Sequence, residues 1–196
     1  SGGPFDSFRT NPIVPFRKNK ISKSKNLSKD LKIAIGLLRG FANGTLDVAQ
    51  VFDAELWGKY YAVASIWGGW HSIQWRNIRF YYNPITAKLE PIAFDEQLKY
   101  FKRNSFEPTS NKVPLAATII GGDPQIKFFY EKTLAKLKKE AQDNITEEWV
   151  RPLQKRNLRI LHKEYPLLGG INFFGLAKAA SESLKRSKSH YQYSVI

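Results

Sequence analysis

Two short segments near the middle of the chain carry the pattern of β-strands. Residues 78–82 alternate and are rich in aromatic and β-branched side chains, and residues 89–94 form a second short segment. A turn-forming Asn-Pro pair follows the first segment. Pairing the segments around that turn predicts a β-hairpin, which sets Asn77 roughly opposite Phe94 and Asp95 at its open end.

Elsewhere, apolar residues recur at helical spacing behind residues that favour a helix start. The predicted helices cover residues 29–42, 54–68, 124–142, 147–163 and 172–186. Their expected N-terminal caps are Ser28, Asp53, Asp123 and Thr146 for the first four helices in turn. The stretch 113–120 is compatible with either a helix or a strand.

The apolar spacing also predicts which face of each helix turns inward. In the helix over 54–68, the residues expected to face the core are Leu56, Tyr60, Val63 and Trp67. In the helix over 124–142, the expected core residues are Ile126, Phe129, Tyr130, Leu134 and Leu137. The lysines expected to face solvent on that helix are Lys132, Lys136, Lys138 and Lys139.

These elements predict an α+β fold that is mostly helical and built around one aromatic hairpin. Residues 1–26 are basic and rich in proline and glycine at the start, so we expect a weakly ordered lead-in. Residues 27–196 show no internal repeat and no second boundary, which predicts a single domain.

The charge balance is strongly basic, with 31 Lys and Arg against 17 Asp and Glu and a net charge of +14. Such an excess favours anionic partners, among them nucleotide phosphates, nucleic acid, an acidic protein or an anionic membrane. The chain has no cysteine, which excludes disulfides, thiolate metal sites and cysteine nucleophiles. No apolar run approaches the ~20 residues of a membrane span, so no transmembrane segment is expected.

The open end of the predicted hairpin is the main candidate for chemistry. It brings the amide oxygen of Asn77 and the carboxylate of Asp95 together on rigid strand ends. Two such oxygens suit a Mg²⁺ ion that also holds phosphate oxygens, and protein kinases order their metal site as catalytic loop, Asn, hairpin and Asp. The alternative is structural: Asn77 starts a strand and Asp95 caps the segment that follows.

Three stretches of the sequence bear on the metal-site interpretation: GLLRGF at residues 36–41, VFD at 51–53 and FYYNPITAKLEPIAFD at 80–95. They resemble the spore coat protein H-like kinase family over roughly residues 36–135. The resemblance implies a fold similar to the C-terminal lobe of a kinase and transfer of phosphate from ATP with a divalent metal. It further implies that Asp95 binds the metal with Asn77 as second ligand, and it is compatible with a secreted or cell-surface location.

The chain departs from the kinase pattern at the catalytic base. Protein kinases place an Asp five residues before the Asn, and this chain has Ser72 there. Histidine as a residue type can accept a proton near neutral pH, so the neighbouring His71 is the candidate base, or else it is a structural histidine in an aromatic pocket. No phosphate-binding lysine or glycine-rich loop is evident upstream of residue 70, so either a preceding lobe is missing or the chain cannot hold ATP alone.

Aromatic and basic residues flank the same loop. Trp70 and Trp75 either stack on a nucleobase or pack in the core. Arg76 lies in the loop and is the preferred phosphate contact, whereas Arg79 lies on the strand face opposite to Phe80.

Three functions therefore stay open. The first is a protein kinase-like phosphotransferase that uses ATP and Mg²⁺ and acts on a protein hydroxyl. The second is a non-catalytic pseudokinase or surface-assembly protein whose basic face binds an acidic partner. The third is nucleic-acid binding, which the charge and the aromatic residues favour.

Overall fold

The computed structural model of the chain describes residues 12–69, 71–74, 77–95, 118–119, 122–170 and 175–189. This part is mostly helical and contains one antiparallel two-stranded sheet, as expected for an α+β fold. The helices are α2 (Lys18–Ser22), α3 (Lys25–Ala42), α4 (Val48–Val51), α5 (Ala54–Trp67), α7 (Pro124–Gln142), α8 (Ile145–Leu161) and α9 (Leu176–Ser189). The strands are β1 (Arg79–Asn83) and β2 (Lys88–Ile92).

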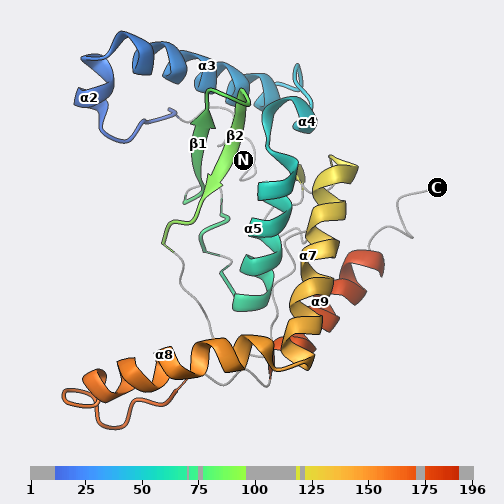
Figure 1. Ribbon diagram of the computed structural model, residues 1–196. Helices are drawn as coiled ribbons and strands as arrows, with labels where there is room; N and C mark the ends of the chain where they lie inside the picture. Colours follow the sequence, from blue (N-terminus) through green and yellow to red (C-terminus); the bar gives the residue numbers. More distant parts are fainter. Residues whose placement is uncertain are drawn as a thin grey trace, which may run out of the picture.

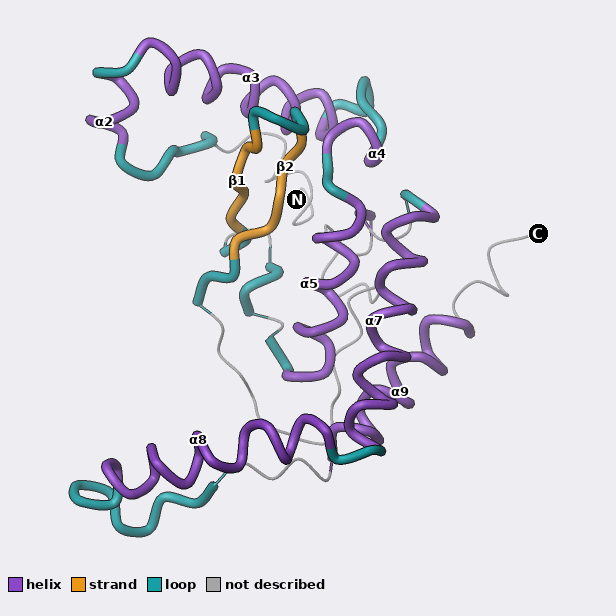
Figure 2. Tube along the Cα trace, in the orientation of Figure 1, coloured by secondary structure: helices purple, strands orange, loops and turns teal. Residues whose placement is uncertain are grey.

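The body of the protein is a group of three helices with the hairpin along one side (Figure 1). Helix α7 packs against both α5 and α9, and α5 also contacts β2. Helix α3 crosses the turn end of the hairpin, while α8 leaves the body as an arm and contacts α7 (Figure 2). The open end of the hairpin points toward the loop that follows α5.

The hairpin forms with the register that its sequence predicts. Arg79 pairs with Ile92 and Asn83 with Lys88, so continuing the register sets Asn77 opposite Phe94. The turn between the strands uses a left-handed residue, Ala87, with φ of 54°. This part of the fold is confirmed.

Aromatic rings join the hairpin to α5. The ring of Phe80 lies 5.7 Å from Trp57 and 6.1 Å from Phe52, and both of these partners are buried. The Trp57 indole nitrogen donates a 2.8 Å hydrogen bond to the main-chain oxygen of Leu89 in β2. These contacts hold one face of the sheet against the first turn of α5.

The capping residues of two helices are confirmed. The Asp53 carboxylate accepts from the Leu56 amide at the start of α5, and Asp123 accepts from the amides of Gln125 and Ile126 at the start of α7. Pro124 stands at the first position of α7, where its missing N–H costs nothing. Ile126, Tyr130 and Leu134 of α7 are buried and Phe129 and Leu137 are half-buried, as predicted. Of its lysines, Lys132, Lys136 and Lys139 are exposed and Lys138 is half-buried.

The predicted inward face of α5 is partly wrong, although Tyr60 and Trp67 are half-buried against the core as predicted. Leu56 and Val63 are exposed, whereas Trp57 and Tyr61 are fully buried. The helix is apolar nearly all round because it packs against the hairpin on one side and α7 on another, so periodicity alone did not select the face.

Three helix boundaries also differ from the prediction. Helix α3 begins at Lys25 behind Ser24, which accepts from the Leu27 amide, while Ser28 instead donates its hydroxyl to the Ile21 carbonyl. Helix α8 begins at Ile145 behind Asn144, not behind Thr146. Helix α9 covers Leu176–Ser189 where 172–186 was expected, and residues 171–174 lie outside the described part.

The basic lead-in differs from the expectation where the structure describes it. Residues 18–22 form α2, and α3 already includes residues 25 and 26, so the lead-in ends in helical structure. Of the stretch 113–120, only residues 118–119 are described, and they are helical. Within the described residues, no helix combines the length and apolar character needed to cross a membrane.

Candidate functional site

The candidate site begins where α5 ends. Gly68 adopts a left-handed conformation with φ of 68°, and the Gly69 amide donates to the Ala64 carbonyl, so the helix stops and the chain reverses. In the loop that follows, the side chains of Ser72 and Ile73 are buried. His71 precedes these two residues and lies near the open end of the hairpin.

His71 and Asp95 meet across this gap. The Nε2 atom of His71 lies 3.2 Å from Oδ2 of Asp95, and the side chains are 26% and 44% exposed. Asp95 has φ of 53°, a left-handed conformation that is uncommon for a residue other than glycine. An uncommon backbone conformation at a residue that makes a polar contact is a feature of functional sites.

Asn77 completes the cluster from the start of the hairpin. Its side-chain Nδ2 donates a 3.2 Å hydrogen bond to the main-chain oxygen of His71. The main-chain N–H of Asn77 also donates to the main-chain oxygen of Gln74, just before β1 begins. The three residues that the sequence singled out at 71, 77 and 95 thus lie together and come from two elements.

The direct pairing of His71 with Asp95 is the feature that the sequence did not reveal. The sequence pattern assigned His71 to proton transfer and Asp95 to metal binding, without a contact between them. Asp95 has a left-handed backbone conformation, which Asp adopts more often than most residues other than Gly, but residue spacing does not indicate the contact. An Asp that accepts from a histidine nitrogen fixes the tautomer and orientation of the ring.

Ser72 and Arg79, which neighbour this cluster, make contacts that support the fold. Ser72 is buried, and its hydroxyl donates a 2.7 Å hydrogen bond to the Gly69 carbonyl, so it supports the loop. The guanidinium of Arg79 lies 4.7 Å from the centre of the Phe94 ring and 5.8 Å from that of Phe16. Arg79 and Phe80 therefore point to opposite faces of β1, as strand alternation predicts.

The donor set of this cluster is modest. Among the described residues no group of three or more His, Asp or Glu side chains is placed to hold a metal ion. Mg²⁺ is commonly held by one or two carboxylates together with the phosphates of its substrate and water. Asp95 and Asn77 carry oxygen atoms of the kind that Mg²⁺ prefers, and an ion that arrives with a nucleotide needs only one or two protein ligands.

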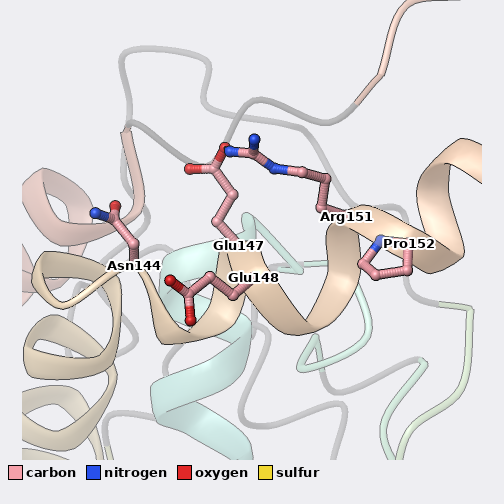
Figure 3. A pocket seen from close by; sticks show the side chains of 5 residues that line it. All are labelled: Asn144, Glu147, Glu148, Arg151 and Pro152. Atoms are coloured by element: carbon pink, nitrogen blue, oxygen red, sulfur yellow. The ribbon is translucent and has the colours of Figure 1, made fainter.

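The remaining predicted binding residues, Trp70, Trp75 and Arg76, lie outside the described part of the chain. A separate surface pocket opens at the start of α8, where Figure 3 shows the Glu147 and Arg151 side chains turned toward each other. Its lining residues are Asn144, Glu147, Glu148, Arg151 and Pro152, none of which the sequence singled out.

Comparison with protein-family models, curated proteins and solved structures finds no match. Any functional argument for this chain therefore starts from the cluster of His71, Asn77 and Asp95.

Proposed function

We propose that the chain is a phosphotransferase-like protein resembling the spore coat protein H-like kinases, with its nucleotide–metal site at the open end of the hairpin. One observation carries the proposal. The loop after α5 and the end of β2 bring His71 Nε2 within 3.2 Å of Asp95 Oδ2, and Asn77 is bonded to the same loop. This reproduces the order of loop, Asn, hairpin and Asp that kinase metal sites use.

In this proposal Asp95 and Asn77 supply oxygen ligands for Mg²⁺. The ion would neutralise charge on the phosphate oxygens of ATP. Asn77 precedes β1 and Asp95 follows β2, so the register of the hairpin brings both ligands to its open end. Kinase catalysis depends largely on such positioning and charge neutralisation.

His71 has the role of general base in the same proposal. In this proposal the Asp95 carboxylate lies against Nε2 of His71 and orients the imidazole ring. The imidazole of His71 would take the proton of an attacking protein hydroxyl. Ser72 is excluded from this role because its hydroxyl is buried and donates to Gly69.

A non-catalytic pseudokinase is the second candidate. The structural use of Ser72 favours it, because the position of the kinase base is filled by a residue that only supports the loop. In that case Asp95 would still bind a nucleotide–metal complex, and the basic surface would bind an acidic partner.

Thermal unfolding with and without ligand tests the proposal. We expect ATP with Mg²⁺ to raise the melting temperature of the unmutated chain, because a ligand that binds only the folded state stabilises it. The rise should disappear in Asp95→Ala and after chelation of Mg²⁺. Asp143→Ala removes an exposed carboxylate at the end of α7 and is the matched control, which should keep the rise.

The same variants separate the two candidates. If phosphoryl transfer occurs, His71→Ala should lower kcat by at least ~100-fold with little change in the ligand-induced melting shift. A shift without any turnover in the unmutated chain would favour the pseudokinase. If the unmutated, full-length protein shows no shift, or Asp95→Ala keeps the full shift, the proposed site is wrong.

A further inference from the structure

Helix α8 exposes a continuous apolar stripe. Ile145, Trp149 and Leu153 are spaced by about one helical turn each, and Ile160 returns to the same face after about two more turns. Trp149 is 72% exposed, Ile160 62% and Ile145 52%, values that are far from those of core residues. None of the described side chains of α8 is buried.

Positive charge accompanies the later part of this stripe, whereas the first turn of α8 carries Glu147 and Glu148, and Glu147 pairs with Arg151. From residue 151 to residue 163 the sequence contains cationic side chains and no acidic ones. The cations are Arg151, Lys155, Arg156, Arg159 and Lys163. Arg156 falls within the apolar stripe by its helical position, and Arg159 falls beside it.

The placement of α8 leaves the stripe accessible. The helix extends away from the body as an arm, and its outer end carries a loop that exposes Tyr165 and Leu167 (Figure 1). The returning chain packs on another side of the helix, since a Cβ atom at Gly170 would meet the Gln154 side chain at 2.3 Å. By their helical positions, Gln154 and Trp149 lie on different faces.

We propose that α8 is a membrane-binding arm that lies in the surface of an anionic lipid bilayer. Amphipathic helices with basic residues on one side and Trp or Leu on the other bind at the boundary between headgroups and acyl chains. Trp149, Leu153 and Ile160 enter that boundary. Arg156 lies along it with its aliphatic stem and extends its guanidinium to lipid phosphates.

The charge pattern selects an anionic bilayer over other occupants. A second copy of the chain would bring two cationic helices together, which is unfavourable. Nucleic acid would satisfy Arg156 and Arg159 through its phosphates, but backbone contacts of that kind make no use of an exposed Trp149 and Ile160. A bilayer satisfies both the cations and the apolar stripe.

Vesicle sedimentation with the full chain tests the proposal. The probes are vesicles of phosphatidylcholine alone and vesicles that also contain phosphatidylglycerol. We expect the partition coefficient to be at least ~10-fold higher on the anionic vesicles, because each basic residue near the surface contributes to attraction. Raising the salt concentration should reduce that preference.

Two matched pairs of variants locate the binding surface. Trp149→Ala should lower binding to anionic vesicles about 10-fold, whereas Ile85→Ala, at an exposed position in the hairpin turn, should leave it unchanged. The double change Arg156→Gln with Arg159→Gln should also lower binding about 10-fold. The double change Lys136→Gln with Lys139→Gln removes the same charge from α7 and should have a much smaller effect.

A measurement on the unmutated fold guards against variants that fail to fold. Lipids with brominated acyl chains should quench part of the tryptophan fluorescence of the unmutated chain, and Trp149→Phe should remove that quenching. Absence of binding to anionic vesicles overturns the proposal, as does equal loss in the α7 and α8 charge variants. Duplex DNA binding, or a dimer that Trp149→Ala dissociates, would also overturn it if either occurs without vesicle binding.

Discussion

The indole nitrogen of Trp57 and the main-chain oxygen of Leu89 are joined by a buried 2.8 Å hydrogen bond. The same carbonyl oxygen accepts from the Asp53 amide at 3.1 Å. This contact ties the first turn of α5 to β2. His71 follows the end of α5 and Asp95 follows the end of β2, so the joint helps to set the separation of the two candidate site residues.

Replacing Trp57 should therefore weaken the fold as a whole. We expect Trp57→Phe to lower the free energy of unfolding by about 2 kcal/mol, through loss of one hydrogen bond and of packing volume. The remaining bond from Asp53 keeps the Leu89 oxygen satisfied, which limits the loss. Chemical denaturation measures it, and Trp149→Phe, at an exposed position, should change the value by less than ~0.5 kcal/mol.

Two helix glycines should respond in opposite directions to alanine. A Cβ atom at Gly58 would lie 2.7 Å from the Ile126 carbonyl oxygen and 2.8 Å from the Tyr130 nitrogen, so α5 and α7 would have to separate. We expect Gly58→Ala to destabilise the protein by about 1–3 kcal/mol.

Gly36 in α3 provides the matched control for this substitution. It has open space where a Cβ would stand, and Gly36→Ala should stabilise the protein by up to about 1 kcal/mol. Paired urea denaturation curves distinguish the two outcomes. A Gly58→Ala variant as stable as the unmutated chain would contradict the close approach of α5 and α7.

Tyr61 should make stability depend on alkaline pH. Burial raises the pKa of Tyr61 well above its usual value of 10.0, and the neighbouring Tyr60 adds a smaller increase. Above about pH 10 the unfolded chain loses the phenolic proton while the folded chain keeps it, so the free energy of unfolding falls as pH rises. Below pH 10 the Tyr61 hydroxyl is protonated in both the folded and the unfolded state, so its titration does not lower the free energy of unfolding there.

The variant Tyr61→Phe tests this dependence. In the part of the chain that the structure describes, the buried Tyr61 hydroxyl has no hydrogen-bond partner. We therefore expect little loss at pH 7, within ~1 kcal/mol, and a flatter decline of stability above pH 10. Tyr81→Phe, at a half-exposed position, should keep the decline; an equally steep decline in Tyr61→Phe would show that another group is responsible.

The sequence predicted local features well where one residue type had one role. Asp123 and Pro124 marked the start of α7, and the Asn-Pro turn set the register of the hairpin. It did not predict the N-cap of α3 correctly, because Ser24 and Ser28 are equally suitable capping residues. It also predicted the inward face of α5 only in part, because packing on two sides removes the periodic signal.

For the candidate site, the sequence placed Asn77 opposite the end of β2 through the hairpin register. The sequence did not predict the contact between His71 and Asp95. That contact depends on the chain reversal at Gly68, on the buried supports of the α5 loop and on the left-handed Asp95. These are tertiary features that residue spacing does not encode.

Paramagnetic broadening of the histidine ring signals tests the central claim most directly. The chain has three histidines, and His162, whose Nε2 bonds to the Leu168 oxygen in the loop beyond α8, is an internal control. With ATP and a small amount of Mn²⁺ in place of Mg²⁺, the account predicts that the His71 signals broaden, that those of His162 stay sharp, and that Asp95→Asn removes the effect. Sharp His71 signals at saturating nucleotide, or equal broadening of all three histidines, would contradict it.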